Sequence, residues 1–245
     1  MASSKLWTCR DSLECVGFVG TELARRHLVV SWAGAENPES VVRICKSCSR
    51  SDSPKKCKGW VVGFTGSRAV VLSPLKVNGR QVQLRVEGFL DFRHTSSASA
   101  VDRLPCGMCT ASMAVSDAFT GHVLARQHLD LANQGQVGSL WHLQAGGIYA
   151  DEYENPLEWL DVPRWPATPT DFILLIELAL YNFHWDTWNE LRNTNPWQLW
   201  VKRSEAVVLS HYVEHLAEYQ SRPSAHDSWL AAQCNLTSGW NPRRS

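Results

Sequence analysis

Arg43-Ile-Cys45-Lys-Ser-Cys48 and Leu104-Pro-Cys106-Gly-Met-Cys109 are the two stretches that decide the fold predicted for this chain. Thiolates two residues apart on a tight turn reach adjacent corners of one tetrahedral metal ion, and two such pairs complete a zinc site. We therefore expect one zinc ion bound by Cys45, Cys48, Cys106 and Cys109. Cys57 follows the first pair closely and can replace one of these ligands.

A site of four thiolates is closed, so its predicted role is to join distant parts of the fold rather than to catalyse a reaction. The chain shows no recognisable signal peptide, which favours metal binding in a reducing compartment over disulfides. A redox-active Cys-x-x-Cys is a third interpretation, but the βαβ pattern of thioredoxin-like proteins is missing. We expect the protein to be intracellular, in the cytoplasm or the nucleus.

Composition indicates an ordinary globular protein of 245 residues, with 44% hydrophobic and 20% charged residues. No window approaches the roughly 20 apolar residues of a membrane span, so no membrane association is expected. The net charge is zero, yet residues 1–110 carry 16 Lys and Arg against 9 Asp and Glu, and residues 111–245 carry 8 against 15. This asymmetry indicates either two parts that dock on each other or a basic part with an acidic partner such as nucleic acid.

The N-terminal portion has the pattern of an antiparallel sheet. Short runs rich in β-branched residues, separated by turn residues, predict strands at 16–19, 27–30, 60–64, 69–72 and 81–86. Asn78-Gly79 predicts a two-residue hairpin turn, because both residue types accept positive φ. Thr65-Gly66-Ser67 predicts another hairpin.

The C-terminal portion is predicted to be helical and rich in tryptophan. Leu124, His128, Leu129 and Ala132 share one face of an expected short helix, and a last strand is expected around 140–143. Four prolines between 156 and 169 exclude a regular helix and mark a linker or a wrapping segment. Helices are then predicted at 172–192, with Thr170 as cap, and from Asn195-Pro196 to Gln220. The expected fold class is α+β, with portions 1–150 and 151–245.

Two short stretches resemble enzyme motifs. Pro105-Cys106-Gly-Met-Cys109, taken with a helix expected after it, resembles the second half of the zinc deaminase signature, although no His-x-Glu or Cys-x-Glu precedes it. His211-Tyr-Val-Glu214-His215 resembles the inverted zinc peptidase motif, in which two histidines one helical turn apart bind the metal. That family also needs a further acidic ligand downstream, and only Glu218 and Asp227 remain.

Two other groups of side chains indicate binding. Basic residues gather around the first cysteine pair and could face phosphates: Arg50, Lys55, Lys56 and Lys58. The alternative interpretation is that these basic residues lie on an ordinary solvent-exposed loop. Nine of the twelve tryptophans follow residue 140, which indicates either packing between helices or, where some are exposed, a protein-binding surface.

From these patterns we predict a non-enzymatic intracellular zinc-binding protein that regulates or engages a protein or nucleic-acid partner. The alternative is a zinc-dependent hydrolase or deaminase-like enzyme that uses the same cysteines with a histidine from elsewhere. The sequence does not decide the oligomeric state.

Overall fold

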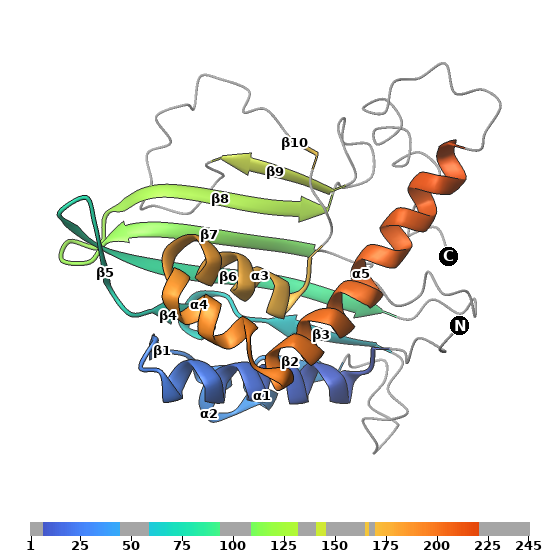
Figure 1. Cartoon of the computed structure of the whole chain (residues 1–245), viewed down its shortest axis with the longest axis horizontal. Coiled ribbons are helices and arrows are strands. Elements are labelled where there is room, and N and C mark those ends of the chain that lie inside the picture. The colour runs from blue at the N-terminus through green and yellow to red at the C-terminus, as the bar shows by residue number, and fades with distance from the viewer. Residues whose placement is uncertain are drawn as a thin grey trace.

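The computed structural model describes residues 7–44, 59–93, 109–131, 141–145, 165–166 and 170–220. An antiparallel sheet and several helices make it an α+β protein, as predicted (Figure 1). The helices are α1 Cys9–Arg25, α2 Ala33–Glu36, α3 Phe172–Phe183, α4 Trp185–Arg192 and α5 Asn195–Gln220, with 3-10 turns at Pro38–Ser40 and Gly66–Arg68. The strands are β1 Val29–Ser31, β2 Val42–Ile44, β3 Gly59–Gly63, β4 Val70–Leu72, β5 Leu75–Val77, β6 Arg80–Arg93, β7 Cys109–Asp117, β8 Val123–Leu131, β9 Trp141–Ala145 and β10 Trp165–Pro166.

The long strand β6 organises the sheet. Along one edge β6 pairs with β7, and the sheet continues through β8 and β9 to β10. Along its other edge β6 pairs in turn with β5, β4 and β3, and β2 adds to β3 while β1 adds to β4. Every pairing is antiparallel.

Turn chemistry fixes the register at the hairpin between β5 and β6. Asn78 and Gly79 both have positive φ, at 48° and 85°, so the predicted two-residue turn is confirmed. The hairpin predicted at Thr65-Gly66-Ser67 is wrong, because β3 and β4 do not pair with each other but lie end to end along β6. A 3-10 turn at Gly66–Arg68 carries the chain between them.

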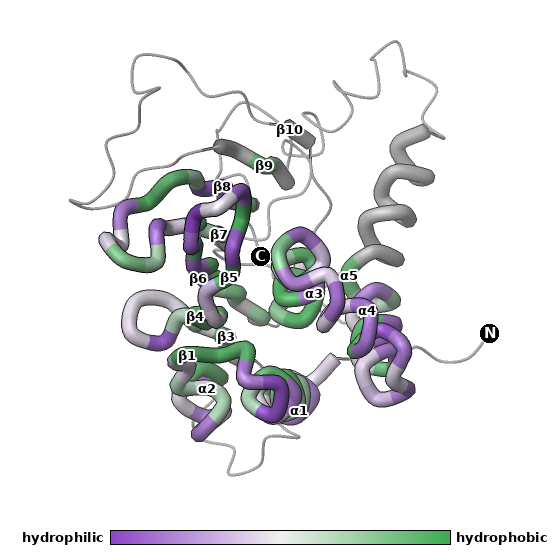
Figure 2. Tube along the Cα trace, turned by 60° about the vertical axis from the view of Figure 1, so that its left-hand side comes forward, coloured by the Kyte–Doolittle hydropathy of each residue, from purple (hydrophilic) through white to green (hydrophobic). Residues whose placement is uncertain are grey.

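The helices cover one face of the sheet. Alternate residues of β6, among them Leu84, Val86 and Leu90, are almost fully buried and share one core with Ile173 and Leu180 of α3. Helices α3, α4 and α5 lie in front of the strands in Figure 1, and α1 and α2 lie below β6 and β7 in both Figure 1 and Figure 2. The opposite face of β6 carries its other residues, including Arg85 and Phe89.

Helix α1 replaces a predicted strand. Residues 16–19 lie inside this helix, so the strand prediction there is wrong. Thr8 and Asp11 form a capping box in which each side chain accepts a hydrogen bond from the other residue's backbone N–H. Val16, Val19 and Leu23 are spaced one helical turn apart and are buried against the sheet.

Two later predictions also need correction. The helix expected over Leu124 to Ala132 is strand β8, which pairs with β7 and β9. The helix expected over 172–192 is divided at His184 into α3 and α4, and its N-cap is Asp171 rather than Thr170. The strands predicted at 60–64, 69–72 and 140–143 and the helix from Asn195 to Gln220 are confirmed within a residue or two. The strand predicted at 81–86 is only the first half of the longer β6, and 27–30 overlaps β1.

In the ranges described above, no helix is both long and apolar enough to cross a bilayer. Residues from both predicted portions contribute to one hydrophobic core, from Trp7 near the start to Val201 in α5.

Candidate functional site

Four strand ends meet at one end of the sheet. Strand β2 ends at Ile44, which pairs with Trp60, and the first residue of β3, Gly59, pairs with Arg93 at the end of β6. On the other side of β6, Leu90 pairs with Cys109, the first residue of β7. The connections 45–58 and 94–108 therefore both leave the sheet and return to it at this end. In lateral order these four strands are β2, β3, β6 and β7.

The predicted metal ligands lie in or beside these two connections. Cys45, Cys48, Cys57 and Cys106 lie outside the described residues, while the backbone of Cys109 begins β7. Cys45 directly follows Ile44, and Cys57 stands two residues before Gly59.

Neighbouring strands are about 4.8 Å apart, so β2 and β7 are separated by about 14 Å at this end. A chain spans up to about 3.5 Å per residue, so cysteines this close to the strand ends can reach a common ion. Among the described residues themselves, no group of three or more His, Cys, Asp or Glu could hold a metal.

The basic residues predicted to contact nucleic acid fall in the first of these connections. Arg50, Lys55, Lys56 and Lys58 lie outside the described residues, between β2 and β3. Arg43, on β2 just before the connection, is described and exposed. The sheet therefore ties this basic stretch to the same end as both cysteine pairs.

Neither enzyme motif gains a complete site. The resemblance of Pro105 to Cys109 to the deaminase signature included a helix directly after Cys109. The structure has strand β7 there instead. The backbone of His211, Glu214 and His215 is helical within α5, as the inverted peptidase motif requires. The structure does not describe the side chains of these three residues.

A buried polar cluster, not anticipated from the sequence, lies where α1, α3 and α5 meet. Asp171 caps α3 by accepting a hydrogen bond from the backbone N–H of Leu174, and Ser204 of α5 donates its hydroxyl to the other carboxylate oxygen. Asp171 is 4% exposed and Ser204 is fully buried. Burial raises the pKa of Asp171, since the charged form loses its hydration. The signal that could have revealed it is an Asp directly before an apolar helical run.

A second contact ties α5 to α1. Arg203 Nη2 lies 2.8 Å from Asp11 Oδ1, and its guanidinium also lies over the rings of Trp7 and Trp200, at 5.5 and 5.6 Å from their centroids. Asp11 at the same time completes the α1 capping box. The start of the described chain and its last helix are thus joined by charge and by aromatic contact.

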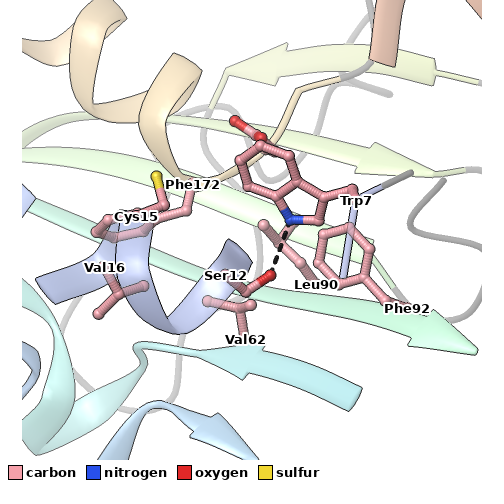
Figure 3. A pocket seen from close by; sticks show the side chains of 9 residues that line it. Trp7, Ser12, Cys15, Val16, Val62, Leu90, Phe92 and Phe172 are labelled. Atoms are coloured by element: carbon pink, nitrogen blue, oxygen red, sulfur yellow. Dashed lines mark hydrogen bonds between the residues drawn. The ribbon is translucent and has the colours of Figure 1, made fainter. Parts of the chain in front are cut away.

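The pocket beside this cluster is small (Figure 3). Ser12 Oγ accepts hydrogen bonds from the indole N–H groups of Trp7 at 2.8 Å and of Trp60 at 2.9 Å. About 10 Å³ is open to the centre of a water molecule, so the pocket has room for one water and for no organic substrate. Burial raises the pKa of the Cys15 thiol well above its usual value, and Asp171 adds to this effect, so Cys15 is a poor nucleophile.

An exposed aromatic cluster lies at the junction of α3 and α4. Tyr181, Trp185 and Trp188 contact one another with ring centroids 4.8–5.4 Å apart. Trp188 is buried, but Trp185 is 53% and Tyr181 49% exposed, and Leu178 is 46% exposed one turn earlier. Trp197 is fully buried, and its indole N–H donates to Glu177. The predicted packing of tryptophan between helices is therefore confirmed for Trp188 and Trp197, and Trp185 is partly exposed.

Comparison of the chain with protein-family models, with curated proteins and with solved structures finds no match.

Proposed function

We propose that this chain is a non-enzymatic intracellular interaction protein in which one zinc ion joins the two cysteine-bearing connections at one end of the sheet. The meeting of the ends of β2, β3, β6 and β7 carries this proposal, since the two connections that contain Cys45, Cys48 and Cys106 start and end there, and Cys109 begins β7. Cys57 is the alternative ligand. Zinc bound there would hold connections 45–58 and 94–108 side by side.

Two surfaces support a binding role. Leu178, Tyr181 and Trp185 are exposed large apolar side chains on one helical corner, the kind of residues that dominate protein interfaces. Near the proposed zinc site, Arg50, Lys55, Lys56 and Lys58 would be held together and could face an acidic partner. We expect a protein partner at the aromatic corner and treat nucleic acid as the candidate for the basic end.

The alternative is a zinc-dependent hydrolase or deaminase-like enzyme, with three protein ligands and an open position for water. One observation favours the interaction protein: Cys109 begins a strand rather than preceding a helix.

X-ray absorption on the purified full-length chain tests the proposal. We expect one zinc per chain with four sulfur neighbours at about 2.3 Å. Cys45→Ser and Cys106→Ser should each lower the zinc content, whereas Cys234→Ser, which removes a thiol outside both pairs, should not. A chain that binds no zinc would contradict the proposal. Three protein ligands and one oxygen would instead support the enzyme.

A further inference from the structure

The sheet face turned away from α3 carries an aromatic ring in its middle. Leu84, Val86 and Leu90 of β6 are buried in the core, and side chains alternate along a strand, so Phe89 lies on the opposite face. Phe89 is only partly buried. In the register it pairs with Gly63 of β3 on one side and with Thr110 of β7, which is exposed, on the other.

The guanidinium of Arg43 lies on the same face, close to that ring. A Cβ built on Gly63 would be 3.5 Å from the nearest ring atom of Phe89 and 3.8 Å from Nη2 of Arg43. Arg43 therefore reaches across β3 toward Phe89, over a residue that has no side chain of its own. Val61, which pairs with Arg43, adds an apolar and partly exposed side chain beside them.

The charge of Arg43 is available to a ligand. Arg85, Arg26 and Arg203 each form an ion pair with a carboxylate. Arg43 is exposed, and no carboxylate whose side chain the structure describes pairs with it. In the sequence, five further cations follow Arg43 outside the described residues: Lys46, Arg50, Lys55, Lys56 and Lys58.

We propose that single-stranded nucleic acid binds across this face, with a base stacked on Phe89 and the Arg43 guanidinium against a phosphate or a base. The inference rests on the proposed function, because it concerns the nucleic acid that was proposed there as a partner. Aromatic rings and guanidinium planes on an open sheet are the surfaces on which unpaired bases stack. Duplex is a poorer fit, since its bases are already stacked and paired.

Binding of a fluorescent oligothymidylate and of the matching oligouridylate by the full-length chain, over a series of salt concentrations, tests the inference. Phe89→Leu should weaken binding about tenfold, within the range measured for loss of one stacked base. Phe119→Leu is the matched control, because Phe119 is 85% exposed in the turn between β7 and β8, and it should change nothing. A preference between the two oligonucleotides would tell DNA from RNA.

Arg43→Gln should also weaken binding and make the salt dependence shallower by about 0.7 in the logarithmic slope, the value expected for one lost contact to a single strand. Lys202→Gln removes an exposed charge from α5 and should leave the slope unchanged. Both exposed sites should tolerate the change without unfolding, which circular dichroism checks.

Three results would overturn the inference: no salt-dependent binding by the unmodified chain, equal effects of Phe89→Leu and Phe119→Leu, or equally tight binding of polyglutamate, which would indicate an acidic protein partner. Zinc content measured on the same preparation separates the two proposals. Zinc without oligonucleotide binding removes this inference alone, and oligonucleotide binding without zinc removes the zinc site alone.

Discussion

At the scale of single residues, the Asp171 carboxylate links two helices. It caps α3, accepts the Ser204 hydroxyl from α5 and is almost fully buried. Its pKa is raised above 3.8 by burial, against the opposing effects of Ser204 and of the backbone N–H groups of Leu174 and Ile173. The same carboxylate thus positions two helices. Its charged form is destabilised because it is buried in the interior.

The burial of the Asp171 carboxylate predicts that the free energy of unfolding depends on pH. Because the pKa of Asp171 is higher in the folded chain than in the unfolded chain, the folded state holds more protons between the two values. Its contribution to the free energy of unfolding is therefore greatest below the unfolded pKa of 3.8 and falls as pH rises through the folded pKa. Asp171→Asn should remove this fall while keeping the cap, so the variant should gain stability relative to wild type as pH rises.

Urea unfolding at several pH values measures the difference. Asp171→Ala is the control, because alanine cannot accept the Leu174 N–H, and it should be about 1 kcal/mol less stable than the asparagine variant. If wild type and Asp171→Asn show parallel pH profiles, the burial of the carboxylate does not have the predicted consequence.

The residue scale also shows a limit of sequence interpretation. Thr170 and Asp171 are adjacent and both can cap a helix, so pattern alone could not choose between them. The choice depends on Ser204, 33 residues away, which meets Asp171 only in the folded chain.

At the scale of elements, Gly88 allows close packing between β6 and the aromatic side chains of Phe64 and Phe172, which link the sheet to α3. A Cβ on Gly88 would lie 2.4 Å from the ring of Phe64, which is fully buried. Phe64 in turn packs edge-on against Phe172 at the start of α3, with ring centroids 5.1 Å apart. The absence of a side chain at position 88 therefore leaves room for the tip of the Phe64 ring against the strand.

Gly88→Ala should lower the free energy of unfolding by about 1–3 kcal/mol, because the added methyl group overpacks the core and displaces Phe64. Chemical denaturation measures the change. Gly63→Ala on β3 is the control, since its nearest atoms would lie at an ordinary contact distance of 3.5 Å. Adding Phe64→Leu to Gly88→Ala should recover part of the loss, and strictly additive effects of the two substitutions would contradict this steric explanation.

The same scale explains which elements could be predicted. Strands 60–64 and 81–86 and the Asn78-Gly79 turn follow local rules of alternation and positive φ. Residues 16–19 are β-branched or aromatic in part, which favoured a strand, but the capping box at Thr8 and Asp11 starts a helix through them. In β8, Leu124 and His128 have helical spacing, yet pairing with β7 and β9 overrides it.

For the candidate sites, the sequence predicts the cysteine pairs, but it does not predict that the strands flanking both connections end at one end of the sheet. That arrangement depends on β3 and β7 flanking β6, a long-range pairing that no local pattern encodes. Arg43 and Phe89 are brought together in the same way, through the register of β2, β3 and β6. Spacing along the chain identifies candidate ligands, and sheet topology decides which of them share a surface.

At the scale of the whole molecule, the packing joins the predicted portions 1–150 and 151–245. Phe172 of α3 stacks on Trp32 with ring centroids 5.3 Å apart, and Trp200 of α5 meets Trp7 edge-on at 5.8 Å. Arg203 pairs with Asp11 across the same boundary. Without α3 and α5, the buried face of β6 and the inner face of α1 would lose part of their apolar cover.

We therefore expect the described body to unfold in one cooperative transition. Calorimetric and van't Hoff enthalpies of the full-length chain should agree, and near-ultraviolet and far-ultraviolet circular dichroism should give one midpoint.

Phe172→Ala should shift that single midpoint downward, because the Phe172 ring contacts both Trp32 and Phe64. The free energy of unfolding should fall by about 3–5 kcal/mol, as for other large buried aromatic residues. Tyr181→Ala, at an exposed ring of the same helix, should shift it much less. Two separate transitions, with only one of them moved by Phe172→Ala, would show that the aromatic contacts across the boundary are too weak to couple the two portions.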